Sequence, residues 1–429
     1  MVSDFKNVQI KKRHLMQWIT MFIVIMPLLL QSLLQFFGLP SVIKYTIDVA
    51  WIVTVLFVLF FGKLKFHRRI IPFVLFVAIF SCYCLIVNLV NYQSVFYFLW
   101  GFRNNFRFYF AFLAVILFLE NDDIECIFKW IDVLFVINAI VSIYQFFVLD
   151  LAKDYCGGIF GTETGSNAST LLFFSIVVAR SLLKYMNGTE KAIICFLKCA
   201  TALLLALFAE LKFFFVVFVL ILIMASLITH FSAKKVAIMI VLVVLVGMSS
   251  SLYQILFGSE LSIESLLEHL TYEHYATTED VGRFSAIPII SETIHTDWLS
   301  KLFGLGLGNC DTSSFAICST PFFQSHQNMN YIWFSSACWF LETGFIGLLL
   351  YLAFFAICFM CVIKQMKRKE GNLLYSQLAI IMSVLCVLLT FYNASLRSEI
   401  GYLAFFVLAL PFINNGDDKK FSVYARLGG

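Results

Sequence analysis

Charged residues are scarce in this chain of 429 residues: they make up 13% of the sequence, against roughly 25% in an ordinary soluble domain. Hydrophobic residues make up 61% and aromatic residues 17%, with 50 phenylalanines. So little polar surface cannot cover a soluble globule of this length. The composition therefore excludes an ordinary soluble domain and indicates a membrane protein.

A strong excess of positive charge is also missing, because the formal net charge is only +4. We therefore expect no nucleic-acid partner. A cleavable signal peptide is not evident either, because the first apolar stretch is too long and lacks a small-residue cleavage site. We expect this stretch to be a membrane span.

The sequence lacks the paired cysteine motifs of a zinc site. Most of its twelve cysteines lie in apolar stretches, where a free thiol packs as a small hydrophobic group. Cys358 and Cys361 have metal-like spacing without a second pair, so we predict packing and no metal. Cys310 and Cys318 share one polar loop. A disulfide between them, or one with Cys156, stays open.

Long apolar stretches are abundant. A spanning helix needs about 20 mainly apolar residues. The twelve candidate stretches are 15–38, 45–62, 70–91, 106–120, 130–149, 168–186, 192–210, 213–231, 236–257, 331–363, 374–393 and 399–414. We predict an all-α polytopic membrane protein with about 12 transmembrane helices in a single membrane domain over residues 1–429. Residues 199–231 also suit one interrupted helix, and 331–363 is too long for one ordinary crossing.

Lysine and arginine are unevenly divided between the two sides that this plan creates. Basic loops stay in the cytoplasm, so we predict that both termini are cytoplasmic. Only eight of the 30 basic residues then lie outside: Lys44, Arg103, Arg107, Lys153, Lys212, Arg283, Lys301 and Arg397. The predicted external segments are a large loop between spans 9 and 10, residues 258–330, and a smaller one, 150–167. "ELSIESLLEHLTYEHY" in the large loop predicts a short surface helix.

Two external cations suit an anionic ligand. Arg283 in "EDVGRFSAIPII" has a guanidinium that matches phosphate oxygens in pairs, and a salt bridge to Glu279 or Asp280 is the structural alternative. Lys212 in "FAELKFFF" stands between two apolar stretches, where a charge is costly unless it is paired or faces water. Ligand contact and a snorkelling lysine are both open for Lys212. Glu210 is a poor partner if both residues are helical, because residues two apart do not share a helical face.

"WGFRNNFRFYF" places Arg103 and Arg107 on one helical face. The two cations repel each other unless an anion lies between them. A diphosphate clamp and an interfacial aromatic belt both remain open for this segment. We predict that Arg397 forms a structural ion pair with Glu399.

Polar side chains begin the segment "SHQNMNYIWF", which leads into an apolar stretch. An imidazole such as His326 can take a proton from a hydroxyl or steady a leaving phosphate. The residues that suit sugar hydroxyls are Gln327, Asn328, Asn330 and Tyr331. A polar helix cap is the alternative. Glu342 further along requires a partner or an aqueous cavity. The glycines of "FGLGLGNCDTSS" lack the spacing of a nucleotide-binding loop and favour a tight backbone path beneath a ligand.

The order of four segments resembles the core of the O-antigen polymerase and ligase superfamily: "GGIFGTETGSNASTLLF" at 157–173, then "GRFSAIPII", "LFGLGLGN" and "HQNMNYIWF…LETGFIGLLLYL". The resemblance implies a multispan helical bundle that transfers glycans between lipid-linked molecules at the outer face of the membrane. It implies neither a nucleotide sugar nor an essential metal or cofactor.

On this resemblance, Arg283 and His326 are the expected catalytic residues, and Arg283 also binds the donor diphosphate. Lys212 in "AELK" matches a position where relatives carry arginine. Arg103 and Arg107 would assist in binding the diphosphate. Gln327, Asn328, Asn330 and Tyr331 would bind the acceptor sugars.

The expected function is a metal-independent membrane glycosyltransferase: a polymerase of polysaccharide repeat units for O-antigen, capsule or exopolysaccharide. It would use an undecaprenyl-diphosphate-linked donor in the bacterial inner (plasma) membrane, with a chain-length regulator and a flippase as partners. One alternative is an O-antigen ligase that transfers polysaccharide to the lipid A core of lipopolysaccharide. Another is a twelve-span flippase or transporter, although the sequence has no evident matching halves.

Overall fold

The chain forms a helical bundle in this computed structural model, which describes residues 2–61, 69–151, 153–163, 165–230, 233–258, 281–313 and 315–413. The longer helices are α1 (Val2–Gln35), α2 (Tyr45–Phe61), α3 (Ile71–Val90), α4 (Val95–Phe118), α5 (Asn121–Phe147), α6 (Ser166–Met186), α7 (Ala192–Phe208), α8 (Lys212–Ile228), α9 (Ala233–Phe257), α14 (Ser335–Lys367), α15 (Leu373–Tyr392) and α16 (Gly401–Ala409). The short ones are α11 (Ala286–Thr293), α12 (Trp298–Phe303) and α13 (Pro321–His326). The described part contains no strand, which confirms the all-α prediction there.

Among the described residues, eight helical stretches are long and apolar enough to cross a membrane, and they lie in α1, α2, α3, α5, α6, α9, α14 and α15. The helices α7, α8 and α16 are apolar but shorter. Helix α4 has the length of a span, but its middle contains two arginines and two asparagines, Arg103, Asn104, Asn105 and Arg107. These helices confirm a polytopic α-helical membrane protein.

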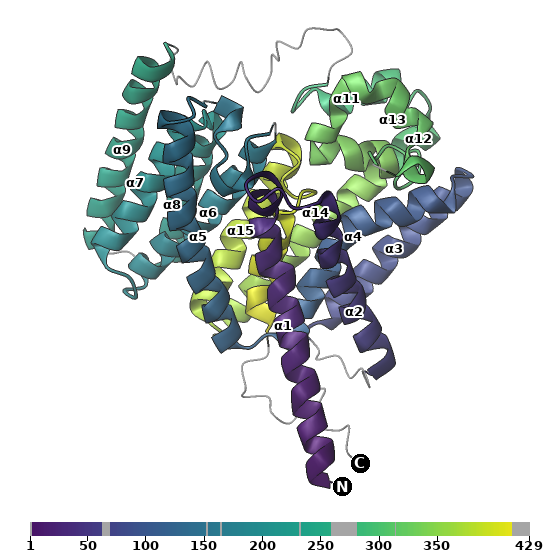
Figure 1. The fold of residues 1–429 in the computed structure, drawn as a ribbon, viewed down its shortest axis with the longest axis horizontal. Helices are drawn as coiled ribbons and strands as arrows, with labels where there is room; N and C mark the ends of the chain where they lie inside the picture. Colours follow the sequence, from purple (N-terminus) through teal and green to yellow (C-terminus); the bar gives the residue numbers. More distant parts are fainter. Residues whose placement is uncertain are drawn as a thin grey trace.

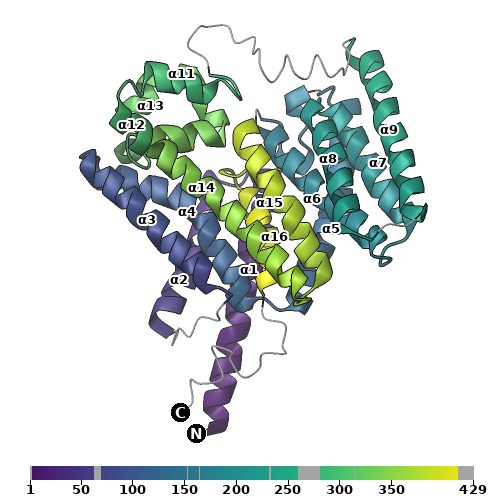
Figure 2. The same ribbon diagram turned by 180° about the vertical axis from the view of Figure 1, so that it is seen from behind.

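The middle of the bundle consists of α14, α15 and α16 (Figures 1 and 2). Helices α2 to α4 lie on one flank and α5 to α9 on the other, with α1 between them. The two flanks meet at the middle, because α15 packs against α6 and α8 while α16 packs against α4. Helices α11, α12 and α13 cover one end of the bundle, which we call the loop end, and α1 begins at the opposite end (Figure 1).

Several boundaries differ from the predicted stretches. Helix α4 begins at Val95, where Ser94 accepts a hydrogen bond from the Phe96 backbone, and not at 106. The predicted interrupted helix is two helices, α7 and α8, and Glu210 in the turn between them has a φ of +51°. The long stretch 331–363 is divided at Gly344, whose φ of +64° interrupts α14.

A first irregular segment, residues 156–161, is buried against α1, α5 and α6. Backbone groups in an apolar interior must be paired, and α5 supplies the partners. The Gln145 amide donates to the Gly158 carbonyl at 3.1 Å and accepts from the Gly158 N–H at 2.7 Å. Asn138 accepts from the Ile159 N–H at 2.9 Å. The asparagine and glutamine of α5 therefore allow this non-helical backbone to enter the bundle.

A second irregular segment, residues 304–311, packs against α14 and α4. The N–H groups of Leu305 and Gly306 donate at 2.9 Å to carbonyls of α14 just before its break. A Cβ atom on Gly308 would come within 1.9 Å of the Tyr97 carbonyl of α4, so only glycine fits there. The glycine-rich stretch thus takes the tight path that its sequence indicates, with helices as its immediate neighbours.

All twelve cysteines are free thiols, including Cys156, Cys310 and Cys318. Burial raises the pKa of the Cys156 thiol to about 11. The predicted surface helix at 260–275 and the proposed partners Glu279 and Asp280 lie outside the described residues.

Candidate functional site

Arg283 lies just before α11 at the loop end. Its guanidinium carbon is 4.8 Å from the centre of the Tyr392 ring at the end of α15. The same ring stacks on Phe213 with a centroid distance of 3.7 Å. Phe213 is the neighbour of Lys212 at the start of α8. One aromatic pair therefore brings Arg283 close to the beginning of α8.

Lys212 is the first residue of α8, and its Nζ lies 3.5 Å from the Glu210 carboxylate. The Tyr253 hydroxyl donates a hydrogen bond to the same carboxylate, and Lys212 Nζ is 5.6 Å from the centre of the Tyr253 ring. The pairing that helical geometry disfavours does occur, because Glu210 lies in the turn between α7 and α8. We call Lys212, Phe213, Arg283 and Tyr392 the cation cluster.

His326 is the last residue of α13, and its ring stacks on Phe322 at a centroid distance of 4.4 Å. Its Nδ1 lies 3.1 Å from the Phe322 carbonyl oxygen and 2.8 Å from the Ser325 hydroxyl oxygen. A carbonyl oxygen only accepts hydrogen bonds, so we assign the proton of the neutral ring to Nδ1. The lone pair is then on Nε2, the arrangement that a general base requires.

The residues after His326 divide into exposed and buried positions. Gln327 and Asn328 are exposed, and Asn330 is half-buried with a φ of +58°. Tyr331 is buried, and its hydroxyl donates to the Cys310 carbonyl at 2.6 Å. The Val281 N–H donates to the Met329 carbonyl at 3.0 Å. This bond ties the His326 segment to the residues just before Arg283.

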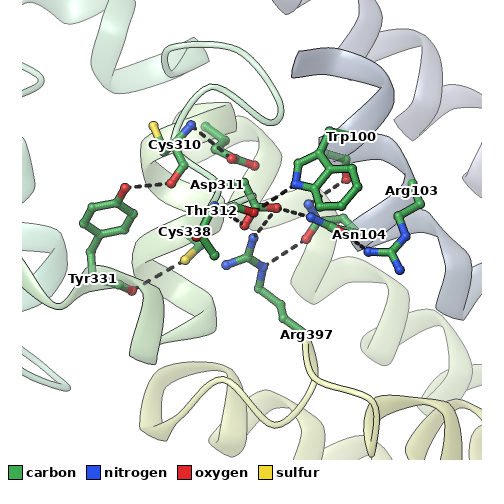
Figure 3. A network of polar contacts seen from close by, with 12 residues as sticks. Trp100, Arg103, Asn104, Cys310, Asp311, Thr312, Tyr331, Cys338 and Arg397 are labelled. Atoms are coloured by element: carbon green, nitrogen blue, oxygen red, sulfur yellow. Dashed lines mark hydrogen bonds and ion pairs between the residues drawn. The ribbon is translucent and has the colours of Figure 1, made fainter. Parts of the chain in front are cut away.

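A second group of charges lies where α2, α4, the 304–311 segment and the α15–α16 turn meet, and Figure 3 shows its centre. Each arginine there has a carboxylate partner: Arg103 pairs with Asp48, Arg107 with Glu399 at 2.9 Å, and Arg397 with Asp311 at 3.4 Å. The predicted pairing of Arg397 with Glu399 is wrong. The irregular turn between α15 and α16 directs the two side chains to different partners.

Two asparagines of α4, Asn104 and Asn105, bond to members of these ion pairs. We call the three ion pairs together with the two asparagines the arginine network. Asn104 donates to Asp311 at 2.7 Å, and Asn105 accepts from Arg397 at 3.0 Å (Figure 3). The Trp100 indole also donates to the Thr312 carbonyl at 2.9 Å. Arg103 and Arg107 are thus held in the network and do not lie on the Tyr392 ring, whose cation is Arg283.

Glu342 is 1% exposed, and its carboxyl group accepts the Cys310 N–H at 3.3 Å. The buried acid predicted from the sequence therefore has a protein partner. Through Cys310 it is connected to Tyr331.

Four residues of these two groups were not predicted from the sequence: the carboxylates Asp48 and Asp311 and the aromatic pair Phe213 and Tyr392. Asp48 gave a signal in the sequence, because an acid in an apolar stretch is costly without a partner. The aromatic pair gave none, because phenylalanine and tyrosine occur throughout the chain. It joins residues that are far apart in the sequence.

The described residues contain no group of three or more histidine, cysteine or acidic side chains arranged to hold a metal ion. Neither a comparison with protein-family models nor one with curated proteins finds a match for this chain. The geometry at the loop end therefore carries the functional argument.

Proposed function

We propose that this protein is a membrane glycosyltransferase that polymerises polysaccharide repeat units on an undecaprenyl-diphosphate carrier. In this proposal α1 to α9 and α14 to α16 give twelve crossings of a bacterial inner membrane. The loop end, with residues 258–330, faces outward, and both termini face the cytoplasm. The lysines in the last turns of α6 and α14 support this orientation, because these turns lie at the end opposite α11 to α13.

The observation that carries the proposal is the cation cluster. Arg283 lies over the Tyr392 ring, which stacks on Phe213, and Phe213 directly follows Lys212 at the start of α8, so residues from distant parts of the chain meet at the loop end. Cations placed at this end of the bundle suit a lipid-linked diphosphate, whose charges lie at the membrane surface. Guanidinium groups bind phosphate oxygens in pairs. The ammonium group of Lys212 adds a single point of charge.

The transfer forms one bond and breaks another. The acceptor hydroxyl oxygen attacks the anomeric carbon of the donor sugar, and the bond from that carbon to the diphosphate oxygen breaks. Undecaprenyl diphosphate leaves with the electron pair, and Arg283 and Lys212 stabilise its charge. His326 Nε2 takes the proton of the hydroxyl. A direct displacement of this kind inverts the anomeric configuration.

Acceptor sugars are assigned to the exposed amides Gln327 and Asn328 and to Asn330, which follow His326 in the chain. Tyr331 is assigned to holding Cys310 because its hydroxyl is bonded there. Arg103 and Arg107 are assigned to support of the loop end, because they pair with Asp48 and Glu399 inside the arginine network and are not part of the cation cluster.

The experiment uses purified protein in lipid vesicles with a synthetic undecaprenyl-diphosphate-linked repeat unit. We expect a ladder of longer glycans without any nucleotide sugar. Arg283→Ala should lower the rate by roughly 100-fold or more, since it removes a group that stabilises the departing charge. Arg69→Ala is the matched control. Arg69 pairs with Glu370 at a distance of 3.1 Å, and neither residue belongs to the cation cluster.

A ladder of normal yield from Arg283→Ala would remove the cation cluster from the mechanism. Transfer only to an added lipid A core would identify a ligase. Movement of the intact lipid-linked unit across the vesicle membrane, with no ladder, would identify a transporter.

A further inference from the structure

Helix α12 directs its large apolar side chains away from the protein. Trp298 is 75% exposed, Leu299 is 69% exposed and Phe303 is 38% exposed. Leu299 and Phe303 are four residues apart and share one side of the helix, and Trp298 is exposed next to Leu299. Most amphipathic surface helices direct this side toward the core, so α12 has the reverse arrangement. An exposed apolar group of this kind marks a contact with lipid or with another protein.

The end of α12 lies against the last turns of α3. The Asn91 amide, directly after α3, donates to the Gly304 carbonyl at 3.2 Å. The Tyr83 hydroxyl lies 3.5 Å from the Leu302 carbonyl and donates to the Thr343 carbonyl at 2.7 Å. Figures 1 and 2 both place α12 beside the end of α3 at the loop end.

Helix α3 is one of the eight candidate membrane spans, with bounds Ile71–Val90. Its last turns expose Ile86 at 59%, Leu89 at 61% and Val90 at 70%. Lipid is the partner that fits such a span. Because the end of α12 adjoins these turns, we expect the lipid that covers them to reach its exposed side chains as well.

The remaining side chains of α12 suit a position at the membrane boundary. Asp297 caps the helix by accepting the Ser300 N–H at 2.9 Å, and Lys301 adds a cation in its last turn. Tryptophan is enriched where acyl chains meet headgroups, and short helices with one apolar side lie flat at that depth.

We infer that α12 is an interfacial helix that rests in the lipid bilayer with Trp298 and Leu299 among the headgroups and the first acyl carbons. The chain runs from α12 directly into residues 304–311, so this contact fixes the depth of Asp311 and the arginine network relative to the membrane. The inference does not depend on the proposed enzymatic function.

The test measures tryptophan emission in vesicles whose lipids carry bromine near the headgroup end of the acyl chains. The contribution of Trp298 is the difference between the wild type and Trp298→Phe. We expect it to lose most of its intensity in these vesicles and to change little with aqueous iodide. Trp339→Phe is the control, because Trp339 is 1% exposed and its contribution should respond to neither quencher.

Leu299→Trp supplies a second reading, because its added emission should also be lost to brominated lipid. Quenching of the Trp298 contribution by iodide and not by brominated lipid would place this face in water and overturn the inference. Quenching by neither would mean that protein covers the face, and this result would overturn the inference as well.

Discussion

At the scale of residues, the arginine network shows how this chain holds charges inside an apolar bundle. A buried cation is tolerated when a carboxylate and further hydrogen bonds surround it. Arg397 has both, because it bonds to Asp311 and to Asn105. Glu342 differs, since its carboxyl group accepts a hydrogen bond from the Cys310 N–H, an uncharged donor.

This difference predicts unequal effects of two nearly isosteric substitutions. Asp311→Asn leaves the guanidinium of Arg397 without its carboxylate, and breaking a buried pair costs about 3 kcal/mol or more. Glu342→Gln keeps an oxygen that accepts the Cys310 N–H, so we expect a loss of about 1 kcal/mol or less. Thermal unfolding of the purified variants in detergent compares the two. Equal losses would show that the network does not depend on the charge of Asp311.

His295 predicts a dependence of stability on pH. Its ring is 0% exposed, and Nε2 lies 3.2 Å from the Phe340 carbonyl. Burial lowers the pKa of His295 below the ordinary value of about 6.5. At a pH between the lowered pKa of the folded state and the ordinary pKa of the unfolded state, the unfolded chain binds more protons than the folded one. Stability therefore falls as the pH is lowered through about 6.5. The unfolding midpoint should therefore decrease on mild acidification.

His295→Gln serves as the matched variant for this prediction. Its amide stays neutral at every pH in the range and can still donate to the Phe340 carbonyl. The acid-induced decrease in the unfolding midpoint should become smaller than in the wild type. An unchanged pH profile in this variant would show that His295 is not the titrating group.

At the scale of elements, the break in α14 is the feature that shapes the loop end. Gly344 has a φ of +64°, and a Cβ atom there would lie 2.3 Å from the Leu302 backbone. The break lets residues 302–306 pack closely against α14, with bonds to the carbonyls of Leu341 and Glu342. It therefore positions the segment that carries Asp311.

Gly344→Ala should destabilise the protein strongly, because it adds both backbone strain and a clash with backbone. Gly188→Ala is the first control, since Gly188 also has a positive φ of 76° but open space around its Cβ position. Gly247→Ala is the second control. Gly247 lies inside α9 with open space around its Cβ position, so this substitution should slightly increase the stability of the protein. The expected order of unfolding midpoints, from highest to lowest, is Gly247→Ala, then Gly188→Ala, then Gly344→Ala. A Gly344→Ala variant as stable as Gly188→Ala would contradict the packing described for the break.

The helices were predictable from the sequence, whereas the irregular segments were predictable only in part. Apolar stretches such as 70–91 and 374–393 match α3 and α15 closely, because the length of the hydrophobic stretch determines the length of the helix there. Residues 156–161 have a buried backbone that depends on Asn138 and Gln145 of another element. Nothing local in the sequence indicates such a pairing.

At the scale of the whole molecule, the sequence singled out the two cations of the cation cluster but neither its aromatic pair nor its arrangement. Arg283 and Lys212 drew attention because cations are rare on one side of the predicted topology. Their approach through Tyr392 and Phe213 required the tertiary fold. The carboxylate partners of Arg107 and Arg397 also could not be identified without the tertiary fold, since the acid nearest to Arg397 along the chain is not its partner.

The orientation of the bundle decides whether the cation cluster can meet a lipid-linked donor outside the cell. The direct measurement is labelling with a maleimide that does not cross membranes, applied to spheroplasts carrying Phe284→Cys or Lys191→Cys and compared with the wild type. Phe284 is 48% exposed beside Arg283, and Lys191 is exposed before α7. We predict that Phe284→Cys is labelled on intact spheroplasts and Lys191→Cys only after permeabilisation. The reverse pattern would place Arg283 in the cytoplasm and contradict the account.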